Sequence, residues 1–380
     1  MYSLRDYGEM IADRDRFNAY SKAILAAVRP GDVVLEIGCG PGVFALLACK
    51  AGARKVYAVD SEDIVHFGRE LALANGLAEQ TEFIQSDSRK AQLPERANVI
   101  VSDIRGSLPF YGQAIVSLED ARRRLLAPSG RMIPQRDILK VAIIEADDYY
   151  SNLIAPWANS SHSLDLSSSL PLLLNGSYAG QFRSEQLLSE PQTWAVLDYS
   201  AGVKSCAAAE LSFSVSRPGI AHGLCLWFDT ELFDGIGFSS GPSAQKTIYG
   251  QVFLPLLQAV SVQQGQKLST RLQGNLVGDE YVWQWETKIW ASAAEPARYF
   301  RQSTFQGTNF SSQGLRRRAA DFVPTLSEQG QADQWLLGAM DGKTSLQQMA
   351  QAAAQRFPSV FARWEDALNR AAELAARFSR

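Results

Sequence analysis

The sequence has no surplus of positive charge, and this absence limits the kind of partner the protein binds. Its 380 residues include 37 Lys and Arg against 40 Asp and Glu, which gives a formal net charge of -3. The longest basic runs are arginine triplets at 122–124 and 316–318. Because domains that bind nucleic acid usually carry a basic surface, we expect no nucleic-acid partner.

Cysteine, histidine and long apolar runs are also scarce. The four cysteines are widely spaced and there are three histidines, so we expect no structural metal site. No window approaches the roughly 20 uncharged apolar residues of a membrane span. The charged start, MYSLRDYGEM, lacks the apolar core of a signal peptide. The sequence therefore predicts no membrane partner and a cytoplasmic location.

Residues 25–150 alternate apolar, strand-like runs with helical segments. Such alternation predicts an α/β fold with a doubly wound, Rossmann-like parallel sheet, whose ligands lie at the carboxyl ends of the strands. Apolar residues at helical spacing in 1–24 predict a helical cover before this domain.

The rest of the chain changes character twice, and 380 residues exceed one ordinary core. Residues 184–310 hold short alternating segments between Gly, Pro and Ser turns, a pattern typical of an antiparallel β barrel. Residues 311–380 have helical spacing and predict a small helical domain. Between 151 and 183, the apolar run 170–174 indicates an extension buried against another surface, such as a second subunit.

The stretch VVLEIGCGPGVFALLACKAGARKVYAVD, residues 33–60, predicts a strand, a glycine turn, a helix and a second strand. Gly38 and Gly40 allow the backbone to approach a ligand, and the helix N-terminus behind them offers unpaired N–H groups. Asp60 follows the loop by about 20 residues, where the acidic residue of a βαβ nucleotide site binds ribose hydroxyls.

Several ligands use such a loop, and three features distinguish among them. No G-x-x-x-x-G-K-[ST] motif is present, so a P-loop site is unsupported. Glu36 would repel a pyrophosphate but suits an ammonium. Asp87 is placed to accept from an adenine amino group, and Ser61 and Ser88 stand beside these acidic positions. Together they favour S-adenosylmethionine over nicotinamide, flavin, or a turn that binds nothing.

Longer motifs resemble the protein arginine methyltransferases in their order and spacing. They are the N-terminal pattern from Tyr7 to Ile24, the loop VVLEIGCGPG, and the runs AGARKVYAVD, LLAPSGRMIPQR, LLSEP, LDYS and HGLCLWFD. The resemblance covers roughly residues 1–300. It implies a class I methyltransferase domain, a β barrel, and a homodimer whose arm is 151–183. It also implies that Arg16 holds the donor carboxylate, Gly38 and Gly40 line the donor, and Asp60 binds its ribose.

The acceptor region departs from that family, in which two hairpin glutamates grip the substrate guanidinium and a Thr-His-Trp barrel loop closes the pocket. Asp103 replaces the first glutamate, Gly112 stands in place of the second, and the barrel loop near 241–246 has neither His nor Trp. Since a guanidinium has five donors, two carboxylates are what orient it. We therefore expect a peptide or protein acceptor that is neutral or anionic and need not be arginine.

Three residues of this hairpin are candidates for catalysis. Asp103 serves as a base or orienter, or instead caps its strand or pairs with Arg105. If Arg105 points into the pocket it repels a cationic substrate. Tyr111 offers a hydroxyl or packs. The alternative is a donor-binding scaffold that has lost catalysis.

The C-terminal segment FVPTLSEQGQADQWLLGAMDGKTSLQQMAQAAAQRFP resembles the PqqD-like winged-helix modules, which bind leader peptides of ribosomally made natural products. The same pattern fits any small helical bundle. If the resemblance holds, the module delivers the acceptor peptide, or the chain is a peptide-binding partner in such a pathway.

Overall fold

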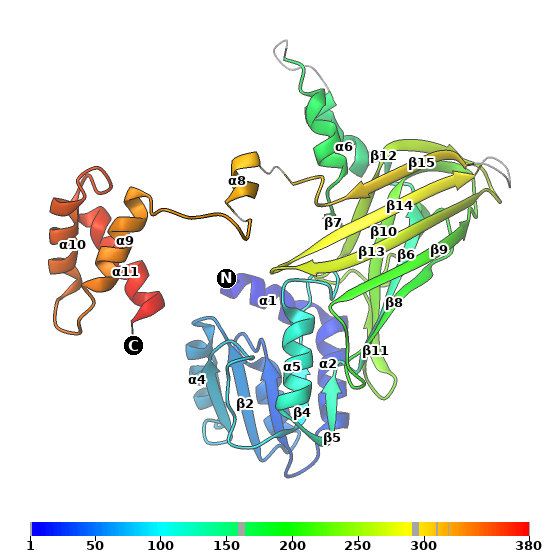
Figure 1. Ribbon diagram of the computed structural model, residues 1–380. Helices are drawn as coiled ribbons and strands as arrows, with labels where there is room; N and C mark the ends of the chain where they lie inside the picture. The colour runs from blue at the N-terminus through cyan, green and yellow to red at the C-terminus, as the bar shows by residue number, and fades with distance from the viewer. Residues whose placement is uncertain (1, 159–163, 291–295, 309–310, 318, 380) are drawn as a thin grey trace. The chain divides into compact units, whose positions relative to one another are not determined.

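The computed structural model describes residues 2–158, 164–290, 296–308, 311–317 and 319–379 (Figure 1). The chain divides into two compact units, Met1–Asn309 and Phe310–Arg380. Each unit is described by itself below.

The first sheet is parallel and has the strand order β3-β2-β1-β4-β5, which confirms the predicted Rossmann-like fold. Its strands are β1 (Val33–Ile37), β2 (Lys55–Asp60), β3 (Thr81–Gln85), β4 (Ala97–Ser102) and β5 (Leu126–Ile133). The helices between them are α3 (Val43–Lys50), α4 (Ile64–Ala74) and α5 (Ala114–Arg124). The chain adds β2 and β3 on one side of β1 and then β4 and β5 on the other side. The switch point therefore lies between β1 and β4, and ligands bind at such a point.

The N-terminal helical segment is two helices, α1 (Leu4–Ala12) and α2 (Arg14–Ala27). Asp13 separates them because its side chain accepts a hydrogen bond from the Arg16 backbone N–H at 3.2 Å and so starts α2. Tyr20 and Ile24 are fully buried and anchor α2 against the first sheet's core.

Two antiparallel sheets form the second domain, a β barrel of the predicted kind. One has the order β7-β12-β10-β6-β8 with β11 paired to β10, and the other the order β15-β14-β13-β9. The strands of the first are β6 (Arg136–Ile144), β7 (Tyr178–Gly180), β8 (Gln192–Asp198), β10 (Gly219–Phe233), β11 (Ile236–Ser239) and β12 (Gln251–Val262). Those of the second are β9 (Cys206–Ser214), β13 (Lys267–Val277), β14 (Glu280–Trp290) and β15 (Pro296–Ser303).

The predicted boundary of the first domain at 150 is wrong, because β6 belongs to the barrel. This strand pairs with β10 and β8, while the parallel sheet ends with β5 at Ile133. An apolar strand looks the same in sequence whichever sheet it joins, so the pattern could not separate the two.

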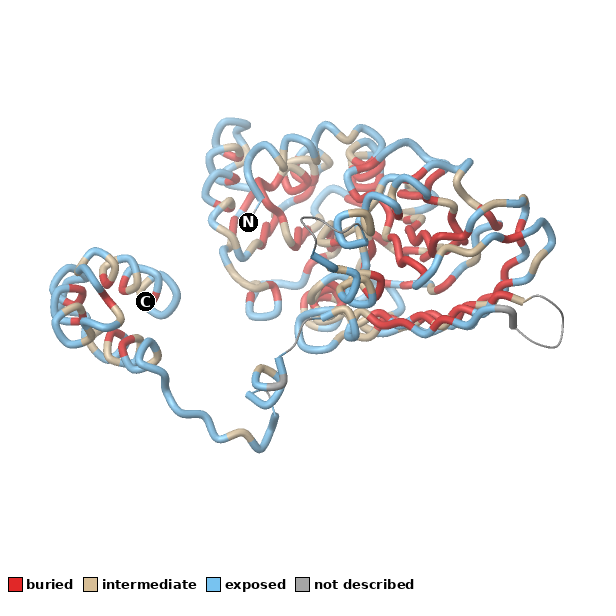
Figure 2. The backbone as a smooth tube through the Cα atoms, turned by 90° about the horizontal axis from the view of Figure 1, so that it is seen from above, coloured by how far each residue is buried: buried red, intermediate tan, exposed pale blue. Residues whose placement is uncertain are grey.

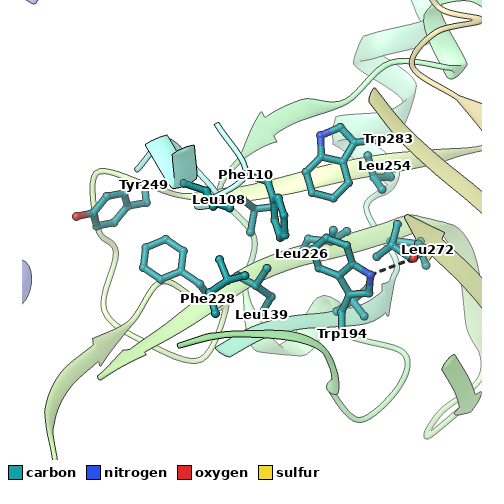
Figure 3. Close-up of a cluster of buried hydrophobic side chains, with 14 of the residues drawn as sticks. Leu108, Phe110, Leu139, Trp194, Leu226, Phe228, Tyr249, Leu254, Leu272 and Trp283 are labelled. Carbon is teal, nitrogen blue, oxygen red and sulfur yellow. Dashed lines mark hydrogen bonds between the residues drawn. The ribbon is translucent and has the colours of Figure 1, made fainter. Parts of the chain in front are cut away.

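The hairpin after β4 ties the two domains together. Leu108 and Phe110 lie in the barrel core, where the Phe110 ring centroid is 5.1 Å from that of Trp194 and 6.0 Å from that of Trp283 (Figure 3). Figure 2 shows the buried backbone of this unit as extended stretches of red. Burying two large apolar side chains fixes the path of the hairpin, because each contributes about 1.5–3 kcal/mol.

The segment 151–183 contains helical turns and one short strand. Its elements are α6 (Asp147–Ala158), η1 (Ser167–Ser169), α7 (Leu170–Leu174) and β7, and residues 159–163 of the predicted arm lie outside the described residues. A further turn, η2 (Ser184–Gln186), follows. Leu174 is buried, whereas Leu172 is 41% exposed. The dimerisation arm stays a prediction.

The second unit is a helical bundle with its own core. Its helices are α8 (Ser312–Arg316), α9 (Glu328–Gly338), α10 (Leu346–Arg356) and α11 (Trp364–Phe378). Leu336, Met349 and Leu374 are buried together. The winged-helix interpretation is wrong for the described residues of 310–380, because they include no strand and a wing is a β hairpin.

Candidate functional site

A cavity of about 1050 Å³ opens at the carboxyl ends of the parallel strands. Its walls come from α1, α2, the loops that follow β1, β2, β3 and β4, and the barrel segment before β12. It therefore lies at the switch point that the strand order defines.

The glycine loop after β1 forms a cradle that only glycine can build. Gly38 and Gly40 have φ values of +67° and +51°, in the left-handed region. A Cβ atom on Gly38 would collide with Ile104, and one on Gly40 would collide with the ring of Tyr7. Both glycines are where the sequence analysis put them. Gly38 lines the cavity, whereas Gly40 is buried beneath Tyr7 and is not among the described residues that line it.

Asp60 lies beside this cradle at the end of β2. Its Oδ2 accepts from the Gly40 N–H at 2.8 Å, and its Oδ1 accepts from the Glu62 N–H at 3.0 Å. Each carboxylate oxygen has a second lone pair, so both can also accept from a ribose hydroxyl. Ser61 is exposed and lines the same wall. These acceptor oxygens fit the ribose hydroxyls in the adenosine part of S-adenosylmethionine.

Glu36 has a structural task that the sequence analysis did not foresee. It is 4% exposed, and its Oε2 accepts from the Ala45 N–H in the first turn of α3 at 2.7 Å. Burial raises the pKa of Glu36 to about 8, although the Ala45 hydrogen bond acts in the opposite direction. Its predicted contact with an ammonium stays a prediction, while its bond to α3 is part of the fold.

This raised pKa makes folding stability depend on pH. Below about pH 4.5 the Glu36 carboxyl is protonated in both the folded and the unfolded chain, so it costs no stability there. Between about pH 4.5 and 8 it ionises in the unfolded chain but stays protonated in the folded chain, which favours unfolding. We expect the free energy of unfolding of the native chain, relative to Glu36→Gln, to fall as pH rises through this window. Urea unfolding of both proteins at pH 5 and pH 8 measures the difference, and a constant difference would contradict the assignment.

The Asp87 carboxylate lines the cavity and is paired with Arg89. Arg89 holds both oxygens, with Nη2 2.7 Å from Oδ2 and Nε 3.0 Å from Oδ1. Hydrogen bonds from Arg89 lower the pKa of Asp87 to about 2. The side chain of Asp87 is 28% exposed at the cavity wall, so its predicted adenine contact stays a prediction. Ser88 is buried, and its carbonyl accepts from Arg124 at 2.7 Å.

Arg16 does not have all its N–H groups available for the carboxylate of S-adenosylmethionine. Its Nε and Nη2 both lie 2.6 Å from Oδ2 of Asp103, and its Nη1 donates to the Met10 carbonyl at 2.9 Å. A buried cation lowers its desolvation cost by pairing with the nearest carboxylate. A guanidinium has five N–H donors, so the remaining ones can still meet a donor carboxylate at the cavity wall.

Arg105 is a buried link between the two domains, which corrects its predicted role in the acceptor pocket. Its Nη1 donates to Asp137 at 2.7 Å and to Thr230 at 2.9 Å, and its Nη2 donates to the Tyr20 hydroxyl at 2.5 Å. Its side chain is 2% exposed. Of the two alternatives in the sequence analysis, pairing with Asp103 is the one observed, at 3.3 Å.

Tyr249 is a site residue that the sequence analysis missed. Its hydroxyl donates to Oδ2 of Asp103 at 2.6 Å and accepts from Nε of Arg16 at 3.1 Å. Figure 3 shows its oxygen directed away from the barrel core. The barrel thus reaches the cavity through Ile248 and Tyr249, a few residues after the predicted loop at 241–246. The only sequence signal was an aromatic residue close behind that loop.

The far side of the hairpin faces solvent and the barrel. Tyr111 is 59% exposed at the cavity wall, so it is not held against Asp103. Gly112 is not among the described residues that line the cavity, and the next residue, Gln113, bonds the Gly278 carbonyl at 2.8 Å. The position of the missing second glutamate is therefore directed towards a barrel turn.

Neither a metal-binding cluster nor a membrane-spanning helix is present in the described part of the chain. No group of three or more His, Cys, Asp and Glu residues there could hold a metal ion. No described helix has the length and apolar character to cross a membrane.

Both domains of the first unit are similar to parts of known methyltransferases. The model of the arginine methyltransferase oligomerization subdomain matches residues 135–286, and that of ribosomal protein L11 methyltransferase matches residues 20–135. Probable protein arginine N-methyltransferase 6 of Arabidopsis thaliana is 30% identical over 249 residues, which are 63% of this chain and 57% of that protein. The chain is similar to the protein arginine methyltransferases. The two matched ranges meet at 135, between β5 and β6.

Further relatives of this chain are also protein arginine N-methyltransferases. Protein arginine N-methyltransferase 2 of Dictyostelium discoideum is 33% identical over 48% of this chain and 34% of its own length. Protein arginine N-methyltransferase 1 of Schizosaccharomyces pombe is 28% identical over 68% of this chain and 78% of its own length. The chain thus spans 57% and 34% of the first two relatives.

Solved structures share the fold. A Trypanosoma brucei PRMT1 enzyme-prozyme heterotetrameric complex with AdoHcy has a TM-score of 0.71 at 22% identity, covering 79% of this chain and 98% of that one. Arabidopsis thaliana protein arginine methyltransferase 10 has a TM-score of 0.70 at 23% identity, covering 79% and 97%. The Rossmann-like and barrel domains therefore have the arrangement of that fold.

Proposed function

We propose that this protein transfers a methyl group from S-adenosylmethionine to a side chain of a peptide or protein. The support is the cradle of Gly38 and Gly40 beside Asp60, together with the likeness to protein arginine N-methyltransferases. When bound, S-adenosylmethionine supplies a methyl group activated by its sulfonium. Asp60 would bind the ribose hydroxyls, and the spare N–H groups of Arg16 would hold the carboxylate.

The acceptor, we infer, is neutral or anionic, and the state of Asp103 carries this inference. Arg16 and Tyr249 both bond its Oδ2 at 2.6 Å, and Arg105 contacts its Oδ1 at 3.3 Å. Burial raises the pKa of Asp103, but the two guanidiniums outweigh it and lower that pKa below its usual value. Such a carboxylate is a weak base and has no free pair of oxygens for a third guanidinium.

The local charge balance supports the same acceptor class. Arg16 and Arg105 are balanced by Asp103 and Asp137, and all four side chains are at most 8% exposed. Within this group of four, an arginine substrate would find no carboxylate that is not already paired with Arg16 or Arg105, and an unpaired buried charge is strongly unfavourable. The acceptor would therefore arrive already nucleophilic, as a carboxylate or a neutral imidazole does, and need no proton removed by Asp103.

The test uses labelled S-adenosylmethionine and synthetic peptides that differ only in the acceptor residue. We expect methyl transfer to peptides with Glu, Asp or His to exceed transfer to the matched arginine peptide at least tenfold. Equal or faster transfer to arginine would overturn the proposed acceptor class and leave the methyltransferase proposal intact.

Gly112→Glu provides a companion prediction. Because the structure directs this position towards the barrel turn at 278–279, we expect the new carboxylate to add no transfer to arginine peptides. The matched control is Gly76→Glu, at an exposed glycine that is also left-handed and outside the cavity. A gain in arginine methylation with Gly112→Glu alone would contradict this geometry.

A donor-binding partner without turnover is the second candidate, and the engagement of Asp103 favours it. A chain of this fold occurs in an enzyme-prozyme complex. Binding of S-adenosylhomocysteine, with no labelled methyl transfer to any peptide or lysate protein, would select this candidate. A homodimer formed through 151–183 and a cytoplasmic location are further parts of the proposal, and sedimentation velocity tests the first.

A further inference from the structure

Four large side chains are both exposed and part of the cavity wall. They are Tyr2 at 56%, Ile11 at 43%, Tyr111 at 59% and Ile248 at 41% relative exposure. Scattered exposed apolar residues are ordinary, but a group around one opening usually marks a binding surface. These four residues are called the apolar rim below.

The apolar rim is assembled from three separate segments that other contacts hold in place. Tyr2 lies 5.9 Å from Tyr7, measured between ring centroids, and Tyr7 covers Gly40. The Tyr111 ring lies over Gly106, where a Cβ atom would be 2.9 Å from it. The Ile248 N–H donates to Oδ2 of Asp13 at 2.9 Å, which ties the barrel segment to the turn before α2.

The arginines of the cavity wall are paired with carboxylates rather than offered at the opening. Each arginine that lines the cavity in the described chain has a carboxylate partner: Arg16 with Asp103, Arg89 with Asp87, and Arg105 with Asp137. On α1, Glu9 pairs with Arg5 at 3.1 Å. Asp6 bonds the Ser3 backbone N–H at 2.7 Å. The described cavity wall therefore offers no unpaired arginine to an anionic neighbour of the acceptor, whereas the apolar rim is open to apolar contact.

We propose that the apolar rim binds apolar or aromatic side chains that flank the acceptor residue of the substrate peptide. This inference rests on the proposed function, because an acceptor that reaches Asp103 must pass the rim. A flanking Leu or Phe would cover Tyr111 and Ile248, removing apolar surface from water on both partners. Glycine or charged neighbours would leave that surface exposed.

The experiment measures peptide binding rather than turnover, so it does not depend on the acceptor's identity. Fluorescein-labelled peptides with one central His or Glu carry Leu-Phe, Gly-Ser, Lys or Glu neighbours. Fluorescence anisotropy is recorded with the full chain and saturating S-adenosylhomocysteine. We expect the Leu-Phe peptides to bind at least tenfold more tightly than the other three sets. Equal binding, no binding, or preference for a charged set would overturn the proposal.

Variants locate the effect on the rim. Tyr111→Ser and Ile248→Ser should each reduce the Leu-Phe preference at least threefold, whereas Leu73→Ser, at a more exposed position on α4 outside the cavity, should not. Calorimetry should show unchanged S-adenosylhomocysteine binding in all three. If the native chain does not bind S-adenosylhomocysteine, the proposed function fails as well. If the rim variants instead change the oligomeric state, a second copy covers the rim and the peptide proposal is overturned.

Discussion

Replacement of Asp60 by alanine is expected to weaken S-adenosylhomocysteine binding roughly 100-fold or more. The variant would lose both carboxylate oxygens at the cradle, and a hydrogen bond to a charged group contributes about 1.5–3 kcal/mol. Two such bonds to ribose hydroxyls correspond to at least about two decades in Kd. Isothermal calorimetry with S-adenosylhomocysteine measures the loss directly.

The control for this variant is Asp63→Ala. Asp63 stands three residues along the chain, is exposed, and accepts from Gln85 at 2.7 Å without lining the cavity. We expect its Kd to change less than twofold. Since Asp60 also holds the Gly40 N–H, thermal unfolding of both variants should accompany the titrations. A Kd for Asp60→Ala within fivefold of the native value would contradict a ribose site at this position.

The donor half of the site could be predicted because its parts are close together in sequence. β1, the glycine loop, α3 and β2 form a contiguous stretch, and a parallel pair joined by one helix has a fixed handedness. The position of Asp60 then follows from the strand end alone. Its hydrogen bond to Gly40 spans 20 residues, a separation that one βαβ unit encloses.

The acceptor half could not be predicted, because its contacts join distant segments. Arg16 and Asp103 are 87 residues apart, and Arg16 and Tyr249 are 233 apart. Which carboxylate a buried arginine selects depends on tertiary packing, whereas Asp87 pairs with Arg89 only two residues along the chain. Motif spacing identifies such residues as candidates without assigning their partners.

The same dependence on contacts between distant segments explains the errors in the predicted fold. The apolar run of β6 fits either sheet, and only its pairing with β10 assigns it to the barrel. Helical spacing in 328–378 correctly predicted the helices of the second unit. A winged helix also needs a β hairpin, and helical spacing says nothing about whether a hairpin is present. Periodicity predicts elements, and long-range pairing decides the domain to which they belong.

Replacement of Arg105 by methionine is expected to lower the free energy of unfolding by about 3–5 kcal/mol. Breaking a buried ion pair leaves an uncompensated charge, and this cost exceeds the net value of the intact pair. Asp137 is 0% exposed and would keep only the Tyr199 hydroxyl, which donates to its Oδ2 at 2.7 Å. Urea unfolding of the native and variant chains, followed by tryptophan fluorescence, measures the change.

Two further variants separate this effect from a role in the acceptor pocket. Arg89→Met breaks a partly exposed pair with Asp87 and should cost less than about 1 kcal/mol. In the double variant Arg105→Met/Asp137→Asn, both charges are gone, so we expect stability to recover by at least half. A loss below about 1 kcal/mol for Arg105→Met would contradict the buried link. If the stability loss is observed, lower activity of an Arg105 variant reflects a displaced hairpin and barrel, because Arg105 connects the two and has no contact left for a substrate.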